Sequence, residues 1–320
     1  MAEVSWAGAC RSTRVAGMRG SVVQSAMLPP HGQVLVLGNA GIDLSIPVRR
    51  LPQPGETLVG GALRRAPGGK GLNQAVMAAR TGMEVQFCAP LGDDADGRYV
   101  EDRLRAEPFA ALRLPRPGPP TDVSVLLVAA DSENCIVTSG ACADALPVAE
   151  AEGFAAGCRP GDVLLLQGNL SQAATVAAAR MGRLGGARVL LNTAPLRWPL
   201  QPVLAECWGV VANAVEAREI TGQQGDEAAA GLAALGPRLA VVTLGAGGCV
   251  AAPGGHSPAP ASQPVDSTGA GDAFCGVLAS ALARGLEPQD AITAAQRAAA
   301  QTVRRRGAFE ALPARFDLVG

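Results

Sequence analysis

The chain of 320 residues has few of the residues that build metal centres and strongly charged surfaces. It has only two histidines, His31 and His256, and its eight cysteines form no CxxC pair, so we do not expect a structural zinc site. Its 27 basic and 28 acidic residues leave a net charge of −1, which gives no basis for binding nucleic acid. No apolar run approaches the roughly eighteen residues that span a bilayer. We therefore expect a small-molecule partner, and cysteines scattered in apolar runs are typical of reduced thiols in a cytoplasmic protein.

Aromatic residues make up only 3% of the chain, so its core must be built from closely packed Val, Leu and Ala. Short apolar runs alternate with helical patterns, which predicts an α/β fold with a doubly wound, mostly parallel sheet flanked by helices. We expect one domain over residues 33–320, whereas residues 1–32 lack periodicity and read as a disordered extension or an upstream start. The strands are expected at 34–38, 163–167, 188–192, 208–213 and 239–245.

The run VDSTGAGDAFCGVLASALARG, Val265 to Gly285, is predicted to be a loop that opens a helix. Gly269 and Gly271 remove side chains from the turn, so the backbone N–H groups from Ala270 onward can converge on one anion. Asp272 lies in the same turn, where the helix dipole favours an ionised carboxylate that can accept a proton. Together these features suit phosphoryl transfer to an alcohol. Taken alone, an Asp at such a position more often only caps its helix.

With Asp266 and the GAGD turn, this run resembles the ATP-binding signature of the PfkB carbohydrate kinase family. A second run, PGGKGLNQAVMAARTG from Pro67 to Gly82, resembles the other signature of that family, and both occur in the family's order and at its usual distance. The resemblance covers about residues 34–316 and implies a ribokinase-like fold with a small β-sheet lid. It also implies ATP and Mg²⁺ as co-substrates and transfer of the γ-phosphoryl group to a hydroxymethyl group. Asp272 would then be the base, and the turn at Gly269, Ala270 and Gly271 the anion hole.

The same resemblance assigns the sugar contacts. They are the side chain of Asp43, the backbone at Gly69 and Lys70, and the amide of Asn73. We expect Asp43 at the end of the strand at 34–38, where a parallel sheet presents its ligand crevice. Without the neighbouring motifs, Asp43 would be read as a turn residue.

Two segments are expected to form the lid over the sugar. The first runs from about 45 to 66, where Val48 to Ala66 alternate without a helical stripe and include the PQPGET run that resembles the family's lid entry. The second runs from about 121 to 141 as a hairpin with its turn at Asp131 to Asn134. Closure of such a lid would exclude water, which competes with the sugar for the phosphoryl group. Relatives commonly dimerise through the lid, so a homodimer is one open arrangement.

The resemblance also implies the nucleotide and metal contacts. Glu216 in NAVEAREITG matches the family's NxxE motif and would hold Mg²⁺ through water, although a Glu in the first turn of an ordinary helix is an equal alternative. Asp266, with the carbonyl groups of Thr268 and Gly307, fits the family's monovalent-cation site, where K⁺ would bind. The implied ATP contacts are Asn213, Thr243, Gly245, Gly248 and Gln296.

Two departures from the ribokinase pattern leave the acceptor open. Gly41 stands where the NxD pattern has Asn, and Asn169, after the strand at 163–167, stands where ribokinases carry Glu. Each change removes a partner for a sugar hydroxyl, at a cost of about 1–3 kcal/mol, so D-ribose is only one candidate. A nucleoside kinase of the same fold is the runner-up, although aromatic residues that could stack on a base are scarce near the lid. A non-catalytic sugar-binding homologue is the third reading, against which the intact Asp272 and its glycines argue.

Overall fold

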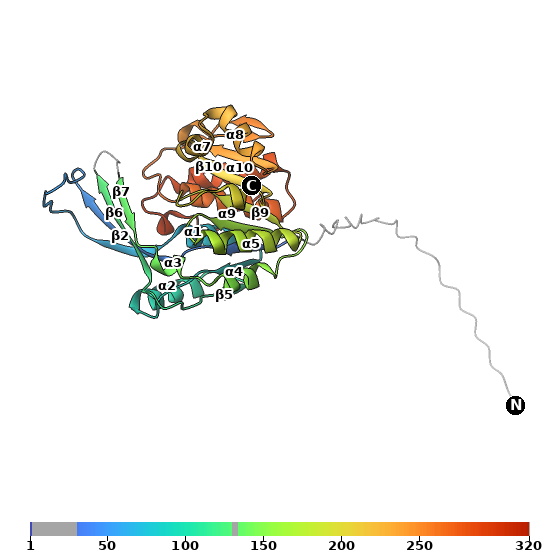
Figure 1. Cartoon of the computed structure of the whole chain (residues 1–320), viewed down its shortest axis with the longest axis horizontal. Helices are drawn as coiled ribbons and strands as arrows, with labels where there is room; N and C mark the ends of the chain where they lie inside the picture. The colour runs from blue at the N-terminus through green and yellow to red at the C-terminus, as the bar shows by residue number, and fades with distance from the viewer. Residues whose placement is uncertain (2–30, 130–133, 320) are drawn as a thin grey trace. The chain divides into compact units, whose positions relative to one another are not determined.

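The computed structural model of the chain describes Met1, residues 31–129 and residues 134–319. Most of the extension expected at residues 1–32, and most of the turn expected at Asp131 to Asn134, therefore lie outside the described residues. Residues His31–Gly320 form one compact unit. Its described part contains a nine-stranded sheet and a four-stranded sheet, and Figure 1 shows the smaller one standing to one side of the larger.

The large sheet has the order β13-β12-β11-β10-β9-β8-β1-β4-β5. Its strands pair in parallel from β11 to β5, whereas β12 pairs antiparallel with both β11 and β13. This confirms the predicted fold class. The strand expected at 239–245 ends at Thr243, because a short 3₁₀ turn follows at Gly245–Gly247. The strands are β1 (Val34–Leu37), β4 (Val85–Cys88), β5 (Ala111–Arg113), β8 (Val163–Gln167), β9 (Arg188–Asn192), β10 (Gly209–Asn213), β11 (Leu239–Thr243), β12 (Cys249–Ala252) and β13 (Gly255–Ser257).

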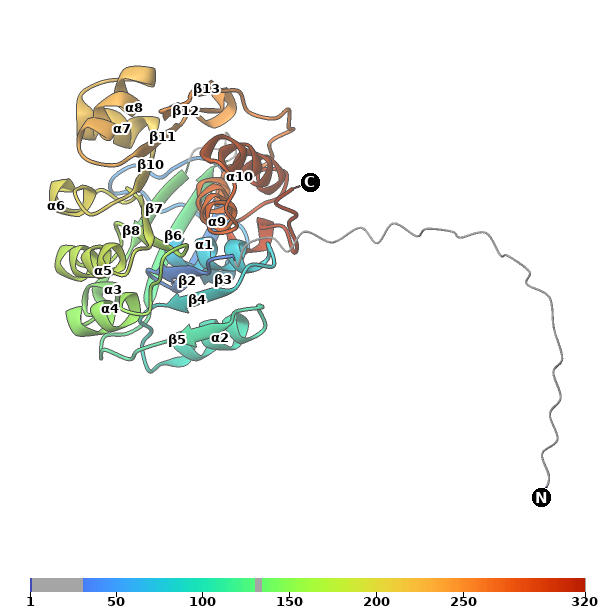
Figure 2. The same ribbon diagram turned by 90° about the vertical axis from the view of Figure 1, so that its right-hand side faces the viewer.

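Helices cover both faces of this sheet. Figure 2 shows α4 (Val148–Ala155) and α5 (Gln172–Leu184) on one side, and α9 (Ala270–Ala283) and α10 (Pro288–Thr302) on the other. Along β1 the side chains alternate between two cores, Val34 and Val36 in one and Leu35 and Leu37 in the other, which explains its unbroken apolar run. Among the described helices, none has the length and apolarity that crossing a bilayer requires.

On the face into which Val34 and Val36 point, called the first face, the helices are α1 (Lys70–Ala79), α2 (Ala95–Arg105), α9 (Ala270–Ala283) and α10 (Pro288–Thr302). The second face is covered by α4 (Val148–Ala155), α5 (Gln172–Leu184), α6 (Gln201–Leu204), α7 (Ala214–Thr221) and α8 (Gly225–Ala234), with the short α3 (Ala141–Asp144) packed beside them. A second 3₁₀ turn lies at Phe309–Ala311.

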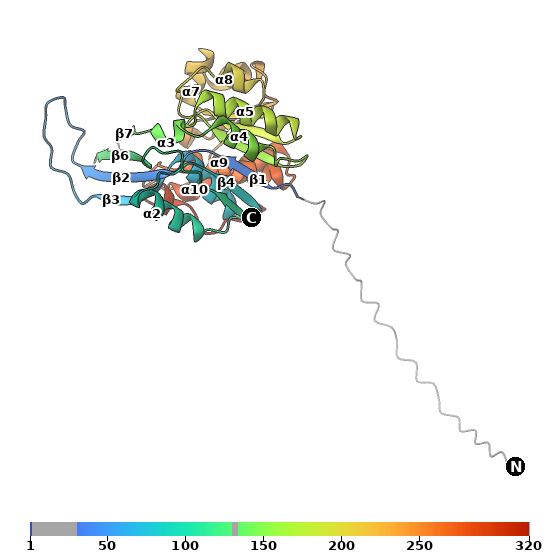
Figure 3. The same ribbon diagram turned by 60° about the horizontal axis from the view of Figure 1, so that its bottom comes forward.

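The small sheet, called the lid sheet below, has the order β3-β2-β6-β7. Strand β2 pairs in parallel with β6 and antiparallel with β3, and β6 and β7 form an antiparallel hairpin. Its strands are β2 (Gly41–Val48), β3 (Arg64–Gly68), β6 (Asp122–Ala129) and β7 (Asn134–Thr138). Figure 3 shows the four strands side by side, with the connection between β2 and β3 projecting beyond them.

The lid sheet corrects two sequence-based expectations. Asp43 does not end the first strand, because β1 stops at Leu37 and Asp43 is the third residue of β2. The lid segment expected from about 45 to 66 is not a strand throughout. Strand β2 ends at Val48 and β3 begins at Arg64, and residues 49–63 between them form no strand. Pro52 and Pro54 lie in that connection and lack the N–H groups that a sheet ladder needs.

Candidate active site

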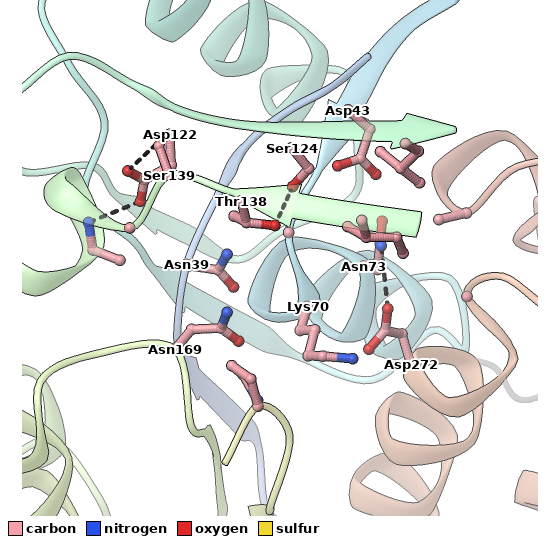
Figure 4. A pocket seen from close by; sticks show the side chains of 18 of the residues that line it. Asn39, Asp43, Lys70, Asn73, Asp122, Ser124, Thr138, Ser139, Asn169 and Asp272 are labelled. Carbon is pink, nitrogen blue, oxygen red and sulfur yellow. Dashed lines mark hydrogen bonds between the residues drawn. The ribbon is translucent and has the colours of Figure 1, made fainter. Parts of the chain in front are cut away.

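A pocket of about 510 Å³ opens between the lid sheet and the loops that follow the strands of the large sheet (Figure 4). Three layers of the fold contribute to it: lid strands β2, β6 and β7, the loops after β1, β8 and β9, and the first turns of α1 and α9. The structure thus gathers residues that are more than 200 positions apart. The sequence-predicted residues among its lining are Asp43, Gly69, Lys70, Asn73, Asn169, Thr268, Gly269 and Asp272.

Asp272 lies in the first turn of α9 and is 8% exposed. Two consecutive residues of α1 donate hydrogen bonds to its carboxylate. Asn73 Nδ2 lies 3.2 Å from Oδ2, and Gln74 Nε2 lies 3.1 Å from Oδ1. The two helices approach closely because Gly276 has no side chain, since a Cβ there would lie 2.4 Å from the carbonyl oxygen of Gln74. The side chains of Asn73 and Gln74 therefore hold the Asp272 carboxylate in place in the pocket wall.

The turn before Asp272 has the form that the glycines predict. Gly269 takes the left-handed conformation with φ 79°, and a Cβ there would lie 3.0 Å from the Cα of Ala308. Gly271 faces open space, because a Cβ on it would meet nothing within 4 Å. The N–H of Ala270 donates to the carbonyl of Ser267 at 3.3 Å, so this residue does not offer a free donor. In the described part of the chain, no group accepts from the N–H groups of Gly271 and Asp272, which leaves them for an anion.

Asp43 reaches the pocket from the middle of the lid sheet (Figure 4). Burial raises the pKa of Asp43 from 3.8 to about 6. The Ser124 hydroxyl opposes this shift, the charge of Asp272 adds to it, and the charge of Lys70 opposes it. Gly68 on the neighbouring strand makes room for the side chain, because a Cβ there would lie 2.2 Å from the Asp43 carboxyl carbon. A carboxylate in this position can accept hydrogen bonds from a bound polyol.

Two buried amide oxygens in the pocket wall have no hydrogen-bond partner within the protein's described residues. They are Oδ1 of Asn73 and Oδ1 of Asn169. Buried polar atoms are rarely left unpaired in folded proteins, so these oxygens are places where a ligand's hydroxyl groups can donate. A third amide, Asn39, uses its Oδ1 to accept from the N–H of Gly71 at 3.2 Å.

The sequence analysis missed several residues of this wall. Asn39 is one, although the GNAGID run after β1 contained it. Ser124 and Thr138 face the pocket from paired lid strands, with their hydroxyl oxygens 3.0 Å apart. Arg197, in the loop after β9, donates to the Asn169 carbonyl at 2.6 Å and so holds the loop that carries that amide. Only the alternation along the lid strands could have pointed to the two hydroxyls.

The residues with predicted nucleotide contacts lie outside this pocket. Asn213 and Glu216 form a capping box at the start of α7. The N–H of Glu216 donates to Asn213 Oδ1 at 2.9 Å, and the N–H of Asn213 donates to Glu216 Oε2 at 3.2 Å. Thr193 also donates to Glu216, at 2.7 Å. The contacts that Glu216 makes in this structure are those expected at an ordinary helix start. The Glu216 carboxylate still has lone pairs for a metal-bound water.

The remaining predicted nucleotide contacts divide into two places. Thr243 is paired with Asn213 across β10 and β11, so both lie at the same end of the sheet, next to Gly245. Gly248 has φ 91° and a Cβ on it would lie 2.1 Å from the Ser257 carbonyl oxygen, which requires glycine. Gln296 is 6% exposed, and both ends of its amide bond Ser257. The hydrogen bonds of the Gln296 amide are thus made within the protein.

Asp266 ties the loop before α9 to the segment after α10. One oxygen of its carboxylate accepts from the N–H and hydroxyl of Thr268, at 2.9 and 2.6 Å, and the other accepts from the N–H of Gly307 at 2.8 Å. Burial alone would raise the pKa of Asp266, but these donors hold it below its usual value. The carboxylate is thus ionised at neutral pH, as a cation ligand must be.

Comparison with known proteins gives consistent matches over nearly the whole described unit. The family model described as pfkB family carbohydrate kinase matches residues 32–315. A ribokinase of Haemophilus influenzae is 32% identical over 292 residues, covering 88% of this chain and 95% of that protein.

Solved structures show the same fold. The crystal structure of a Thermotoga maritima ribokinase superimposes with a TM-score of 0.79 at 26% identity, covering 88% of this chain and 96% of that one. The structure of an Arabidopsis thaliana ribokinase complexed with ribose and ATP gives a TM-score of 0.77 at 25% identity, covering 90% and 96%.

Proposed function

Since the chain belongs to the pfkB family of carbohydrate kinases and is an ATP-dependent sugar kinase, we propose that its acceptor is the hydroxymethyl group of an aldopentose such as D-ribose. The observation that supports this most directly is the Asp272 carboxylate, held by Asn73 and Gln74 beside a wall with unpaired amide oxygens. The base and the polyol contacts then face one another across a single pocket.

In the proposed reaction, Asp272 accepts the proton of the acceptor's hydroxymethyl group as its oxygen attacks the γ-phosphoryl group of ATP. The free N–H groups of Gly271 and Asp272 stabilise the negative charge on the transferring group. The phosphoryl group thereby moves from ATP to the sugar oxygen, leaving ADP and a sugar phosphate, and the proton passes to Asp272. The lid sheet, with Asp43 on its inner side, excludes water that would otherwise compete.

The acceptor would be bound by two unpaired amide oxygens and by the Asp43 carboxylate. Asn73 Oδ1 and Asn169 Oδ1 each accept a sugar hydroxyl, and Asp43 accepts one or two more. Asn169 replaces the carboxylate that the ribokinase pattern has at this place, so its hydroxyl contact is a neutral hydrogen bond and not a charge-assisted one. We therefore expect weaker discrimination among pentoses than a carboxylate would give.

The cation requirements are also proposals. Glu216 would hold Mg²⁺ through water, because its carboxylate is fixed by Thr193 and Asn213 and Mg²⁺ keeps part of its hydration shell. The ion would neutralise charge on the nucleotide's phosphates. A K⁺ ion would bind near Asp266, with the carbonyl groups of Thr268 and Gly307. Replacing K⁺ by tetramethylammonium should then lower turnover, and unchanged turnover would contradict the K⁺ site.

The lid sheet would also form the proposed homodimer contact. Val125 on β6 is 41% exposed and Val137 on β7 is 68% exposed, so apolar surface is open to a second copy. Sedimentation of the purified protein tests this, since a monomer at all concentrations would contradict it.

The test of the proposed function is ADP release from ATP and Mg²⁺ with a panel of pentoses, hexoses, keto-deoxy acids and nucleosides. We expect a pentose to give the highest kcat/KM, and Asp272→Asn to remove the response. A response restricted to nucleosides would favour the runner-up activity. Silence across the panel, with ATP still bound, would contradict the aldopentose acceptor.

A further inference from the structure

Two glutamines continue the hydrogen-bond network behind Asp272 without lining the pocket. Gln74 is fully buried and Gln167, the last residue of β8, is 1% exposed. Gln74 Nε2 donates both to Asp272 Oδ1, at 3.1 Å, and to Asn192 Oδ1, at 3.2 Å. Gln167 Nε2 donates in turn to Gln74 Oε1 at 2.9 Å. A row of amides thus leads from the end of β8 to the carboxylate.

The surrounding contacts leave Gln74 only one amide orientation. Asn192 uses its own Nδ2 to donate to the Val211 carbonyl at 3.2 Å, so its Oδ1 faces Gln74 as an acceptor. If the Gln74 amide turned over, its oxygen would face two acceptor oxygens and its NH₂ would face the NH₂ of Gln167. Each of these contacts would be repulsive, so Gln167 and Asn192 together direct the Gln74 donor at Asp272.

Half of the buried Gln167 amide is unsatisfied. Its Oε1 is buried without a hydrogen-bond partner in the described residues. Gly38, after β1, makes room for that oxygen, because a Cβ there would lie 2.0 Å from it. A methionine or leucine would fill the same space without burying an unpaired oxygen. The useful part of the side chain is therefore the NH₂ group that it gives to Gln74.

We infer that Gln74 is a positioning residue for the base Asp272, and that Gln167 fixes the direction in which Gln74 donates. The inference rests on the proposed role of Asp272. With Asn73 on Oδ2 and Gln74 on Oδ1, the plane of the carboxylate is fixed, and the lone pairs that remain face the acceptor hydroxyl.

The first test is Gln74→Met, assayed by ADP release with the panel sugar that gives the highest rate. We expect kcat to fall about 10–100-fold with little change in KM for ATP, because one charge-assisted hydrogen bond is lost from the base. The loss should fall on kcat rather than on KM for the sugar, because the proposed sugar contacts Asp43 and Asn169 are retained in the variant.

The second test separates orientation from packing. In Gln167→Met the Gln74 donor is still held by Asp272 and Asn192, so we expect a smaller fall in kcat, again with little change in KM for ATP. The double variant should be no slower than Gln74→Met alone, because Gln167 acts only through Gln74. Gln86→Met is the matched control: the Gln86 amide also donates to a glutamine, Gln33, at 2.7 Å, but from β4 and outside the pocket. Its kcat and both KM values should match the wild type.

The outcomes are distinguishable. A folded Gln74→Met enzyme, judged by circular dichroism and ATP binding, with wild-type kcat would overturn the inference. If that variant does not fold, an unchanged kcat in Gln167→Met would overturn it instead. Additive losses in the double variant would overturn the orienting role of Gln167. If the wild type is silent across the acceptor panel, the proposed function fails, and if Asp272→Asn keeps its turnover, the base role on which this inference rests fails. If Asp272→Asn is inactive and both methionine variants behave as wild type, only this inference fails.

Discussion

Asp43→Asn should make the protein more stable at neutral pH while impairing acceptor binding. Burial raises the pKa of Asp43 from 3.8 to about 6, so the folded protein holds this proton more tightly than the unfolded chain does. A difference of about two pKa units corresponds to about 3 kcal/mol at pH values above the folded pKa. An asparagine carries no charge, so the variant should recover up to about 3 kcal/mol of unfolding free energy.

The sign follows from proton binding. Between pH 3.8 and about 6 the folded state is protonated at Asp43 and the unfolded state is not, so the wild-type unfolding free energy falls as pH rises. Below pH 3.8 both states are protonated, and above about pH 6 the full cost of the buried charge is present. The stability difference between Asp43→Asn and wild type should therefore open between these limits and stay constant at higher pH.

Urea denaturation of both proteins at pH 4, 5, 6, 7 and 8 measures this difference directly. Asp93→Asn is the control, because its carboxylate is 88% exposed and its removal should shift stability by less than about 0.5 kcal/mol at every pH. A pH-independent difference, or a variant less stable than the wild type at pH 8, would refute the reasoning. With the same variant, KM for the sugar should rise, because a carboxylate that accepts hydrogen bonds from the sugar's hydroxyl groups has become a neutral amide.

Three further substitutions test the site. Asp272→Asn should lower kcat by about 10²–10⁴-fold while ATP binding, followed by calorimetry, is retained; wild-type turnover would exclude it as the base. Gly69→Ala should destabilise the fold by about 1–3 kcal/mol and weaken sugar binding, because φ is 107° and the new Cβ would lie 2.9 Å from the Asn39 carbonyl oxygen; an unchanged Tm would contradict this. Asn169→Ala should raise KM for the sugar about tenfold with KM for ATP unchanged, and equal effects on both would argue against a sugar contact.

The sequence predicted the fold class well because β-type apolar runs and helical patterns alternate through most of the chain. The run around Asp272 predicted a glycine turn that opens a helix, and α9 begins there. The grouping of Asn73 with Asp272 depended on resemblance alone, since nothing in the local pattern brings together residues 199 positions apart.

What the sequence did not predict depends on tertiary contacts. The position of Asp43 was misjudged because β1 and β2 belong to different sheets, although only residues 38–40 separate them. The link from Gln167 to Gln74 joins residues 93 positions apart, at a strand end and inside a helix, and leaves no local signal. The nucleotide contact assigned to Gln296 by resemblance stays a prediction, whereas the two bonds from its amide to Ser257 leave no signal in the sequence.

The division of the pocket between the lid sheet and the helices has a consequence for how such an enzyme could diversify. Asp43, Ser124 and Thr138 face the pocket from the lid strands, whereas the proposed base Asp272 and its supporting amides belong to α9 and α1. Substitutions on the inner face of the lid can thus accumulate without moving the Asp272 carboxylate. New acceptors could be acquired by selection, or in a designed library, through a few lid positions while the proposed base and its supporting amides are inherited intact.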